Sequence, residues 1–295
     1  MFVDINSASQ LLELMKERDQ TFPQVVAEYE AFRSNTSCEA VREQMRETLK
    51  VMRASVENGI LDRGERTHII TGYGHIFNQA IEEDRVLGGS LLRNVVLYAL
   101  AVGQHNAGLG RIVACPTAGA CGVVPGAMLA VADELGSSEE ELIEALLVMG
   151  GVGIVSAAQG PISGAEGGCQ SECGVASSMA AGAIVYLMGG SGEQVFAAAS
   201  LALQSHLGLV CDPLASLVEV PCVTRNATSA TTAVAAANMA MAGIPAVIPY
   251  DECVAAMKQI GKSMPESLRE TSKGGLASSP TGRRIYDELR RKHSQ

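Results

Sequence analysis

Apolar and polar residues recur along most of the chain with the spacing of amphipathic helices. Runs that alternate with a period of two are few, and the β-branched stretches are short. We therefore expect an all-α, mainly helical protein. The pattern predicts charged amphipathic helices near the N-terminus and small-residue, apolar helices further on, at 7–20, 22–34, 38–59, 88–103, 122–135, 138–149, 169–189, 192–204, 228–242, 252–262 and 281–291.

Residues typical of helix ends support several of these boundaries. Pro23 stands where a helix begins and Gly59 where one ends, the positions that these residue types favour. Ser138 precedes three glutamates, which suit a first turn because the helix dipole is positive there. Asp251 is expected to cap the helix that follows it. The stretches "ETSKGG" and "SSPTG" predict a loop before the last helix.

The domain organisation follows from length and composition. The 295 residues contain 47% hydrophobic residues, enough for a sizeable core, and show no internal repeat or low-complexity linker. We expect one helical domain over 1–295, with 1–62 as a polar outer layer and 88–262 as an apolar core that carries the site. The apolar stretch 174–190 approaches the length of a membrane span, but its Ala, Gly and Ser content favours a buried helix.

Charge and cysteine content limit the classes of binding partner and the cellular compartment that we expect. A net charge of -10 and a pI of about 5.1 argue against nucleic acid and anionic membranes as partners, because both require clustered basic residues. The N-terminal segment lacks the features of a signal peptide, so we expect a cytoplasmic protein. In that reducing compartment the eight cysteines are expected to be thiols or metal ligands.

The basic residues of the apolar part are informative because they are so few. Lysine is absent from 51 to 257, which argues against pyridoxal phosphate, a cofactor that needs a lysine in its pocket. Arg225 is the only arginine between 112 and 257. It could anchor a carboxylate with its two-pronged guanidinium, or it could pack its stem on the core with its head in water.

A glycine-containing loop, "ACPTAGACGVVPGAM" at 114–128, precedes an apolar helical run. Backbone N–H groups at such a turn can hold an anion, here a carboxylate, and the Thr117 hydroxyl can add a hydrogen bond. An ordinary connection between helices is the alternative. Cys115 and Cys121 lie in the same loop, but their spacing matches no common zinc or ferredoxin pattern.

Two pairs of cysteines suggest a metal site. Cys169 and Cys173 are four apart in "SGAEGGCQSECG" and would share one face of a helix. Cys211 and Cys222 each have a proline close by in "LVCDPLASLVEVPC", which predicts stiff, non-helical turns for both thiols. Some of these four could form a metal site, since thiolates are preferred ligands of iron–sulfur clusters and zinc. The alternative is that they are buried free cysteines, which are common.

The five histidines supply candidates for a general base. His206 is the best placed, because it lies five residues before Cys211. A structural histidine whose nitrogens are satisfied inside the fold is the commoner alternative for each of them.

Four segments together resemble the α chain of the bacterial iron–sulfur-dependent L-serine dehydratases, also called L-serine ammonia-lyases. These are "PTAGACGVVPG", "SGAEGGCQSECG", "LGLVCDPLASLVEVPC" and "TRNA", and the resemblance covers at least 88–245. It implies a [4Fe-4S] cluster held by Cys169, Cys211 and Cys222. The other cysteines of these segments fall where that family usually has different residues. With three protein ligands, one iron stays open as a Lewis acid, and its fourth position is expected to hold water or substrate.

The resemblance also implies the reaction, which is deamination of L-serine to pyruvate and ammonia. The substrate carboxylate would rest on the turn of Thr117, Ala118 and Gly119, with Arg225 and Asn226 nearby. Single-chain relatives close the open iron with a C-terminal cysteine, whereas this chain ends in "RRKHSQ". Two-chain relatives have a separate β chain that covers the site, so a partner chain is expected.

One stretch departs from the family pattern, and other activities stay open. Relatives carry a Thr-Gly-Gly turn where this chain has Thr71-Gly72-Tyr73-Gly74-His75, which makes His75 a second candidate base. A cysteine desulfidase or a threonine dehydratase could use the same apparatus. A non-catalytic zinc or redox-sensing protein is the alternative of a different class.

Overall fold

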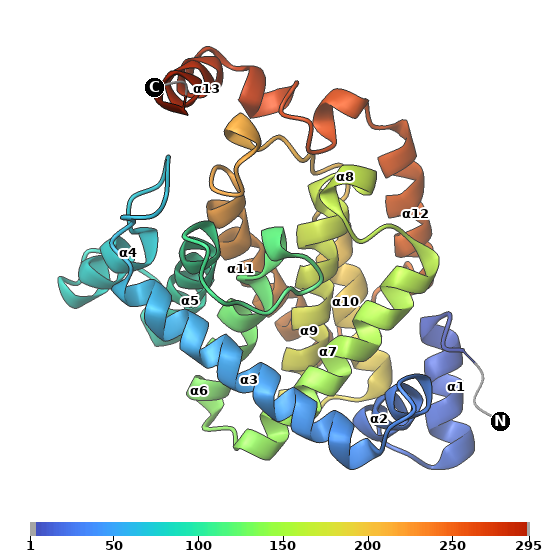
Figure 1. Cartoon of the computed structure of the whole chain (residues 1–295). Coiled ribbons are helices and arrows are strands. Elements are labelled where there is room, and N and C mark those ends of the chain that lie inside the picture. Colours follow the sequence, from blue (N-terminus) through green and yellow to red (C-terminus); the bar gives the residue numbers. More distant parts are fainter. Residues whose placement is uncertain (1–3, 294–295) are drawn as a thin grey trace.

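The computed structural model describes residues 4–293, and these residues form helices joined by short loops (Figure 1). No β-strand occurs among them, apart from a single isolated bridge between Cys211 and Arg269. The all-α prediction is confirmed. The α-helices are α1 Ala8–Arg18, α2 Phe22–Arg33, α3 Cys38–Leu61, α4 Tyr73–Glu82, α5 Gly89–Ala107, α6 Ala130–Leu135, α7 Glu139–Gln159, α8 Gly164–Gly167, α9 Val175–Leu187, α10 Gly192–Gln204, α11 Cys222–Met241, α12 Tyr250–Ser263 and α13 Pro280–His293.

Shorter turns of other helix types connect these elements. Two π-helical turns, in which the hydrogen bonds span five residues, lead directly into α6 and α9. The π turns are η2 Pro125–Leu129 and η3 Gln170–Gly174, and the 3-10 turns are η1 Ala118–Ala120, η4 Leu214–Ser216, η5 Glu266–Leu268 and η6 Gly275–Ser278.

Helix α9 lies at the centre of the molecule, with α7, α10 and α11 packed around it (Figure 1). Its residues 175–185 are all buried. Small side chains let neighbouring backbones come close: the Ser177 hydroxyl donates to the carbonyl of Ser229 at 3.0 Å, and that of Ser178 donates to the carbonyl of Ala199 at 2.8 Å. The apolar stretch is therefore the buried helix that its composition predicts.

Two helical windows are long and apolar enough to cross a membrane by length and composition alone. They are Ala118–Leu135 and Glu139–Gln159, of which 72% and 61% lie buried inside the chain. Core helices of folded proteins commonly have this character, so the two windows are weak indications of a membrane span.

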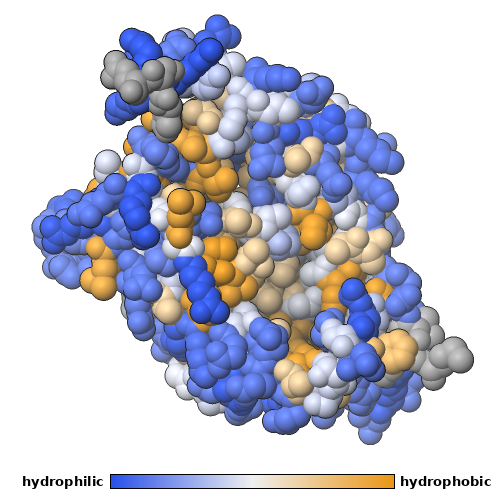
Figure 2. Space-filling model, viewed as in Figure 1, coloured by the Kyte–Doolittle hydropathy of each residue, from blue (hydrophilic) through white to orange (hydrophobic). Residues whose placement is uncertain are grey.

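Helices α2 and α3 cover α7 on one side, and Figure 2 shows an apolar hollow on this face. The hollow has a volume of about 530 Å³ and is lined mainly by apolar side chains, among them Val26, Val41, Met45, Leu146, Leu147 and Ile154. The N-terminal helices thus present polar side chains outward and apolar side chains toward the rest of the chain.

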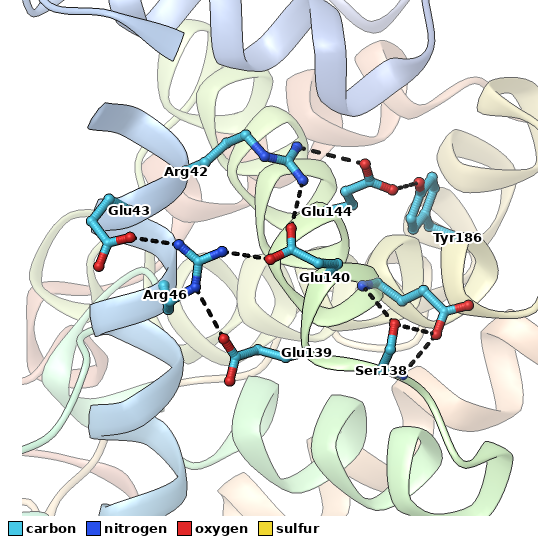
Figure 3. Close-up of polar contacts among 9 residues, drawn as sticks. Arg42, Glu43, Arg46, Ser138, Glu139, Glu140, Glu144 and Tyr186 are labelled. Carbon is cyan, nitrogen blue, oxygen red and sulfur yellow. Dashed lines mark hydrogen bonds and ion pairs between the residues drawn. The ribbon is translucent and has the colours of Figure 1, made fainter. Parts of the chain in front are cut away.

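Charged residues join α3 to the start of α7 at the surface (Figure 3). Arg46 lies 3.0 Å from Glu139 and 2.5 Å from both Glu43 and Glu140. We call this group, with Arg42 and Glu144, the α3–α7 ion network. Beside it, Ser138 and Glu141 form the reciprocal capping box that the sequence indicated for the start of α7.

Several helices differ from the predictions. Helices α4 and α8 were not predicted. Gly74 lets α4 cross closely over α3, where an added Cβ would lie 2.7 Å from the carbonyl oxygen of Gly59. Helix α7 continues to Gln159, since buried packing overrides the low helix propensity of its glycines. Helix α11 begins at Cys222, six residues before the predicted 228.

Asp251 does not cap the helix that it was expected to open. That helix, α12, begins at Tyr250, and its N-cap is Pro249. The Asp251 carboxylate instead accepts hydrogen bonds from the N–H of Ala8 at 2.8 Å and from the Gln159 side chain at 2.6 Å. It therefore stabilises the N-terminal end of α1, a long-range contact that no local pattern predicts.

Candidate functional site

Cysteines gather near α8 and the N-terminal end of α9. The sulfur of Cys169 lies 3.4 Å from that of Cys173, one π-helical turn further on, and it also contacts the thiol of Cys211. Burial raises the pKa of Cys222 to about 12, and the nearby charge of Cys169 adds to this shift. All four are buried. We call Cys169, Cys173, Cys211 and Cys222 the sulfur site.

The pKa of one thiol of the sulfur site is lowered by its neighbours. Hydrogen bonds with Cys173 and Cys211, together with the positive charge of Arg225, keep the pKa of Cys169 well below its usual range. The hydrogen bond to Cys169, together with burial, raises the pKa of Cys173 and that of Cys211. Of these three thiols, Cys169 is therefore the one that ionises most readily.

The C-terminal segment holds Cys211 in place through its backbone. The N–H of Cys211 donates to the carbonyl of Leu268 at 2.9 Å, and the N–H of Glu270 donates back to the carbonyl of Cys211 at 2.7 Å. A glycine on the other side leaves room for the sulfur: a Cβ added at Gly164 would lie 2.8 Å from the Cys211 sulfur. Cys211 is thus on an extended, non-helical segment, as predicted.

The same prediction is wrong for Cys222. Cys222 is the first residue of α11, and Pro221 stands just outside the helix as its N-cap. Proline is tolerated at the beginning of a helix because the N–H that it lacks would have no partner there. The proline before Cys222 therefore marks the start of a helix rather than a turn that excludes one.

Arg225, one turn into α11, uses its guanidinium within the protein. It lies 2.9 Å from Asp212 and donates to the carbonyl of Val210 at 2.8 Å, and it also interacts with the sulfur of Cys169. Asp212 in turn accepts a hydrogen bond from the N–H of Leu276 at 2.7 Å. The guanidinium thus joins the segment that carries Cys211 to the helix that carries Cys222, next to the sulfur of Cys169.

Glu172 is a site residue that the sequence analysis missed. Burial raises the pKa of its carboxyl to about 7, an effect that a hydrogen bond from Thr117 partly opposes. The carboxyl faces the loop of residues 117–119, since a Cβ added at Gly119 would lie 2.6 Å from it. A signal was present: Glu172 is the only charged residue between Glu166 and Glu193, within an apolar helix. A buried titratable group with a shifted pKa is typical of functional sites.

Asn226 fixes the loop that the sequence assigned to the substrate carboxylate. Its side-chain amide donates to the carbonyls of Gly119 and Cys222, both at 2.7 Å, and its oxygen accepts from the N–H of Gly122 at 2.7 Å. Ala118 and Gly119 lie in the 3-10 turn η1. Asn226 therefore holds both sides of the loop by hydrogen bonds, and the first N–H groups of η1 have no acceptor within the turn.

The two candidate histidines lie in different surroundings. His206 is buried, and its ring nitrogens lie 2.8 Å from the carbonyl of Ala202 and 3.0 Å from the hydroxyl of Ser229. Burial lowers its pKa. These contacts favour the structural alternative for His206. His75 is half-buried in the first turn of α4, and among the described residues no hydrogen bond or ion pair joins it to the sulfur site.

The donor set of the sulfur site suits a soft metal centre. No three of the described His, Cys, Asp and Glu side chains surround one point as ready ligands of a single ion. Clustered cysteine sulfurs, one of them beside a guanidinium, are instead the donors that iron–sulfur clusters use. Cys115 and Cys121 are also buried, and burial raises the pKa of both, to about 12 for Cys115.

Comparison with known proteins identifies relatives over nearly the whole chain. Residues 11–277 match the family model described as serine dehydratase alpha chain. The chain is 43% identical over 283 residues to a probable L-serine dehydratase, alpha chain, from Bacillus subtilis, a match that covers 96% of this chain and 94% of that protein. It is 36% identical to the L-serine dehydratase, alpha chain, of Peptoniphilus asaccharolyticus, with 95% and 97% covered. The resemblance inferred from the four motifs is confirmed.

One relative is a longer protein, of which this chain matches only a part. The L-serine dehydratase of Streptomyces coelicolor is 36% identical over 280 residues, which are 92% of this chain but only 60% of that protein.

Proposed function

The chain belongs to the serine dehydratase alpha chain family, and from this premise we propose that it deaminates L-serine to pyruvate and ammonia. The observation that carries the proposal is the buried contact of Cys169 with Cys211 beside Arg225. The carboxyl of Glu172, three residues after Cys169 in the sequence, is also buried and interacts with the charge of Cys169. We propose Cys169, Cys211 and Cys222 as the protein ligands of a [4Fe-4S] cluster. When bound, such a cluster supplies a Lewis acid for departure of the substrate hydroxyl, at the iron that has no protein ligand.

The turn of Thr117, Ala118 and Gly119 is our proposed site for the substrate carboxylate. The support is its N–H groups at the beginning of η1, which suit an anion, and the Asn226 amide that holds the turn in one conformation. Arg225 is committed to Asp212, to Val210 and to the Cys169 sulfur. We therefore assign Arg225 to charge compensation of the sulfur ligands rather than to the substrate.

Glu172 is the proton-carrying group that this chain contributes to the site in our proposal. With a pKa of about 7, its carboxyl can hold or release a proton near neutral pH. Its hydrogen-bond partner Thr117 belongs to the proposed carboxylate turn, which supports a role for the carboxyl beside the substrate. His206 and His75 remain candidates from the sequence, but His206 already has partners on both ring nitrogens.

A second, β chain is the proposed partner, and the cytoplasm is the proposed compartment. The relatives from Bacillus and Peptoniphilus carry the designation alpha chain, and the longer Streptomyces protein contains sequence that this chain does not match. The buried free thiols suit a reducing compartment.

Anaerobic purification tests the proposed function. We expect a brown protein that contains iron and inorganic sulfide and that, with its partner chain, releases pyruvate from L-serine. Replacing Cys169, Cys211 or Cys222 by Ser should abolish iron binding, whereas Cys115→Ser should retain it. Assays with threonine and cysteine distinguish a threonine dehydratase or a cysteine desulfidase. A colourless, zinc-containing and inactive protein would contradict the proposal and favour a non-catalytic metal protein.

A further inference from the structure

Cys173 is the one member of the sulfur site that has no role in the proposed function. Its sulfur lies 3.4 Å from that of the proposed ligand Cys169, and its side chain is 1% exposed. The pair is therefore an ordered contact inside the protein rather than a chance approach of two mobile surface thiols.

The π turn between the two residues explains how the sulfurs meet. Residues four apart lie on one face of an α-helix, and the wider turn of η3 Gln170–Gly174 brings them more nearly into line. A disulfide requires the sulfurs to move from 3.4 Å to about 2.05 Å. It also requires the two Cβ atoms, about 5–6 Å apart at this helical spacing, to come within about 4.5 Å, so the π turn must tighten locally while the side chains rotate.

Cys211 is the competing partner, because its thiol also contacts Cys169. It lies on a different segment, whose backbone is bonded on both sides to Leu268 and Glu270. A bond from Cys169 to Cys211 would have to draw two fixed segments together. A bond to Cys173 joins neighbouring positions of one turn and leaves the rest of the fold in place.

We propose that Cys169 and Cys173 form a reversible disulfide when the sulfur site holds no metal and meets a peroxide. The two thiols lose two protons and two electrons, hydrogen peroxide accepts them to give two molecules of water, and a dithiol reductant restores both thiols. The disulfide keeps Cys169 from being oxidised further to sulfinic or sulfonic acid, which thiols do not reverse. Cys173 is thus a resolving cysteine that preserves a cluster ligand. The proposed disulfide rests on the proposed function in one respect only, which is that Cys169 is a ligand of the cluster.

Peptide mapping of the full chain tests the disulfide directly. The metal-free protein is treated with hydrogen peroxide, its free thiols are alkylated, and it is cut after glutamate. Cleavage after Glu166, Glu172 and Glu193 leaves Cys169 and Cys173 on separate peptides, each with a single cysteine. We expect the two peptides to be joined before treatment with dithiothreitol and separate afterwards. A peptide that joins Cys169 to Cys211, or two unlinked peptides, would overturn the proposal.

Matched variants separate a resolving cysteine from a ligand. Cys173→Ser should contain as much iron as the unaltered chain when prepared anaerobically, but after peroxide and reduction it should regain several-fold less iron and carry sulfinic acid at Cys169. Cys253→Ser is the control, a buried cysteine that contacts Ser200 instead, and it should regain iron normally. Iron loss from anaerobic Cys173→Ser would make Cys173 a ligand and overturn the inference. If the unaltered chain binds no iron, the proposed function fails, while the peptide map still decides the disulfide.

Discussion

Two arginines of this chain each bind carboxylates, but in opposite surroundings. Arg46, at the surface, contacts Glu43, Glu139 and Glu140 in the α3–α7 ion network (Figure 3). Among the residues that the structure describes, Arg225 has a single carboxylate partner, Asp212, whose side chain is only 3% exposed, against 56–58% for the partners of Arg46.

The α3–α7 ion network has more ion pairs than the sulfur site, but we expect each of its pairs to contribute less to stability. Water and salt screen the charges of the α3–α7 ion network, and its long side chains lose conformational freedom when they are ordered. At the sulfur site, each buried charge is stabilised by its protein partner. If that partner is removed, water cannot take its place, so the remaining charge is strongly destabilising. Removing a charge at the sulfur site should therefore destabilise the chain and displace the proposed ligands. Removing a charge in the α3–α7 ion network should change stability little.

Removal of the Asp212 carboxylate should have the largest effect. Asp212→Ala leaves the Arg225 guanidinium buried without its counter-ion and removes the acceptor for Leu276. We expect a loss of about 3–5 kcal/mol in the free energy of unfolding of the metal-free chain. Urea unfolding under anaerobic conditions measures it. Asp84→Ala is the matched control, because Asp84 pairs with Arg93 at 83% exposure, and it should change stability by less than about 1 kcal/mol. Equal losses in the two variants would remove the distinction between the regions.

Glu172→Gln should change how stability depends on pH. The folded-state pKa of Glu172 is about 7, above the ordinary 4.5, so between these values the folded chain holds a proton that the unfolded chain has released. Stability should therefore fall as the pH rises from about 4.5 to 7, by about 3 kcal/mol in all, and this loss should persist above pH 7. The charges of Cys169 and Glu270 also raise this pKa.

The Gln variant keeps an acceptor for the Thr117 hydroxyl but cannot ionise. We expect it to lack this part of the pH dependence and to be more stable than the unaltered metal-free chain at pH 8. Chemical unfolding at pH 5, 6, 7 and 8 measures the difference. Glu166→Gln, at an exposed position of α8, is the control and should follow the unaltered chain. If Glu172→Gln has the same pH profile as the unaltered chain, the carboxyl ionises normally and cannot serve as proposed.

The sequence predicts these two regions unequally. The helices of the α3–α7 ion network follow from periodicity and from the Ser138 capping box, which are local signals. At the sulfur site, motif resemblance points to the cysteines, but no local pattern predicts that Cys211 pairs with residues 268–270 or that Arg225 turns to Asp212. The burial of Glu172 and the π turn beside it also depend on helices that pack from distant parts of the chain. Long-range contacts set the geometry of the site, and one sequence contains little information about them.

A single methyl group at the edge of the sulfur site should have an intermediate effect. Gly164→Ala would place a Cβ 2.8 Å from the Cys211 sulfur, and relief requires the segment bonded to Leu268 and Glu270 to shift. We expect a loss of about 1–3 kcal/mol in unfolding free energy, together with weaker iron retention against a chelator. Gly150→Ala, where an added Cβ has no atom within 4 Å, should instead stabilise α7 by about 0.5–1 kcal/mol. Similar results at both glycines would mean that the space around Cys211 is not constrained.

Arg46→Ala should have the smallest effect, although it removes more ion pairs than any other change considered. Its carboxylate partners stay exposed and regain water, so none is left buried without a partner. The difference in thermal midpoint from the unaltered chain should be small at low salt and should vanish in molar sodium chloride, because salt screens exposed charges. The Asp212→Ala difference should survive the same salt, since buried pairs are screened far less. A salt-resistant loss at Arg46 that matched the loss at Asp212 would show that the α3–α7 ion network anchors the fold as strongly as the sulfur site does.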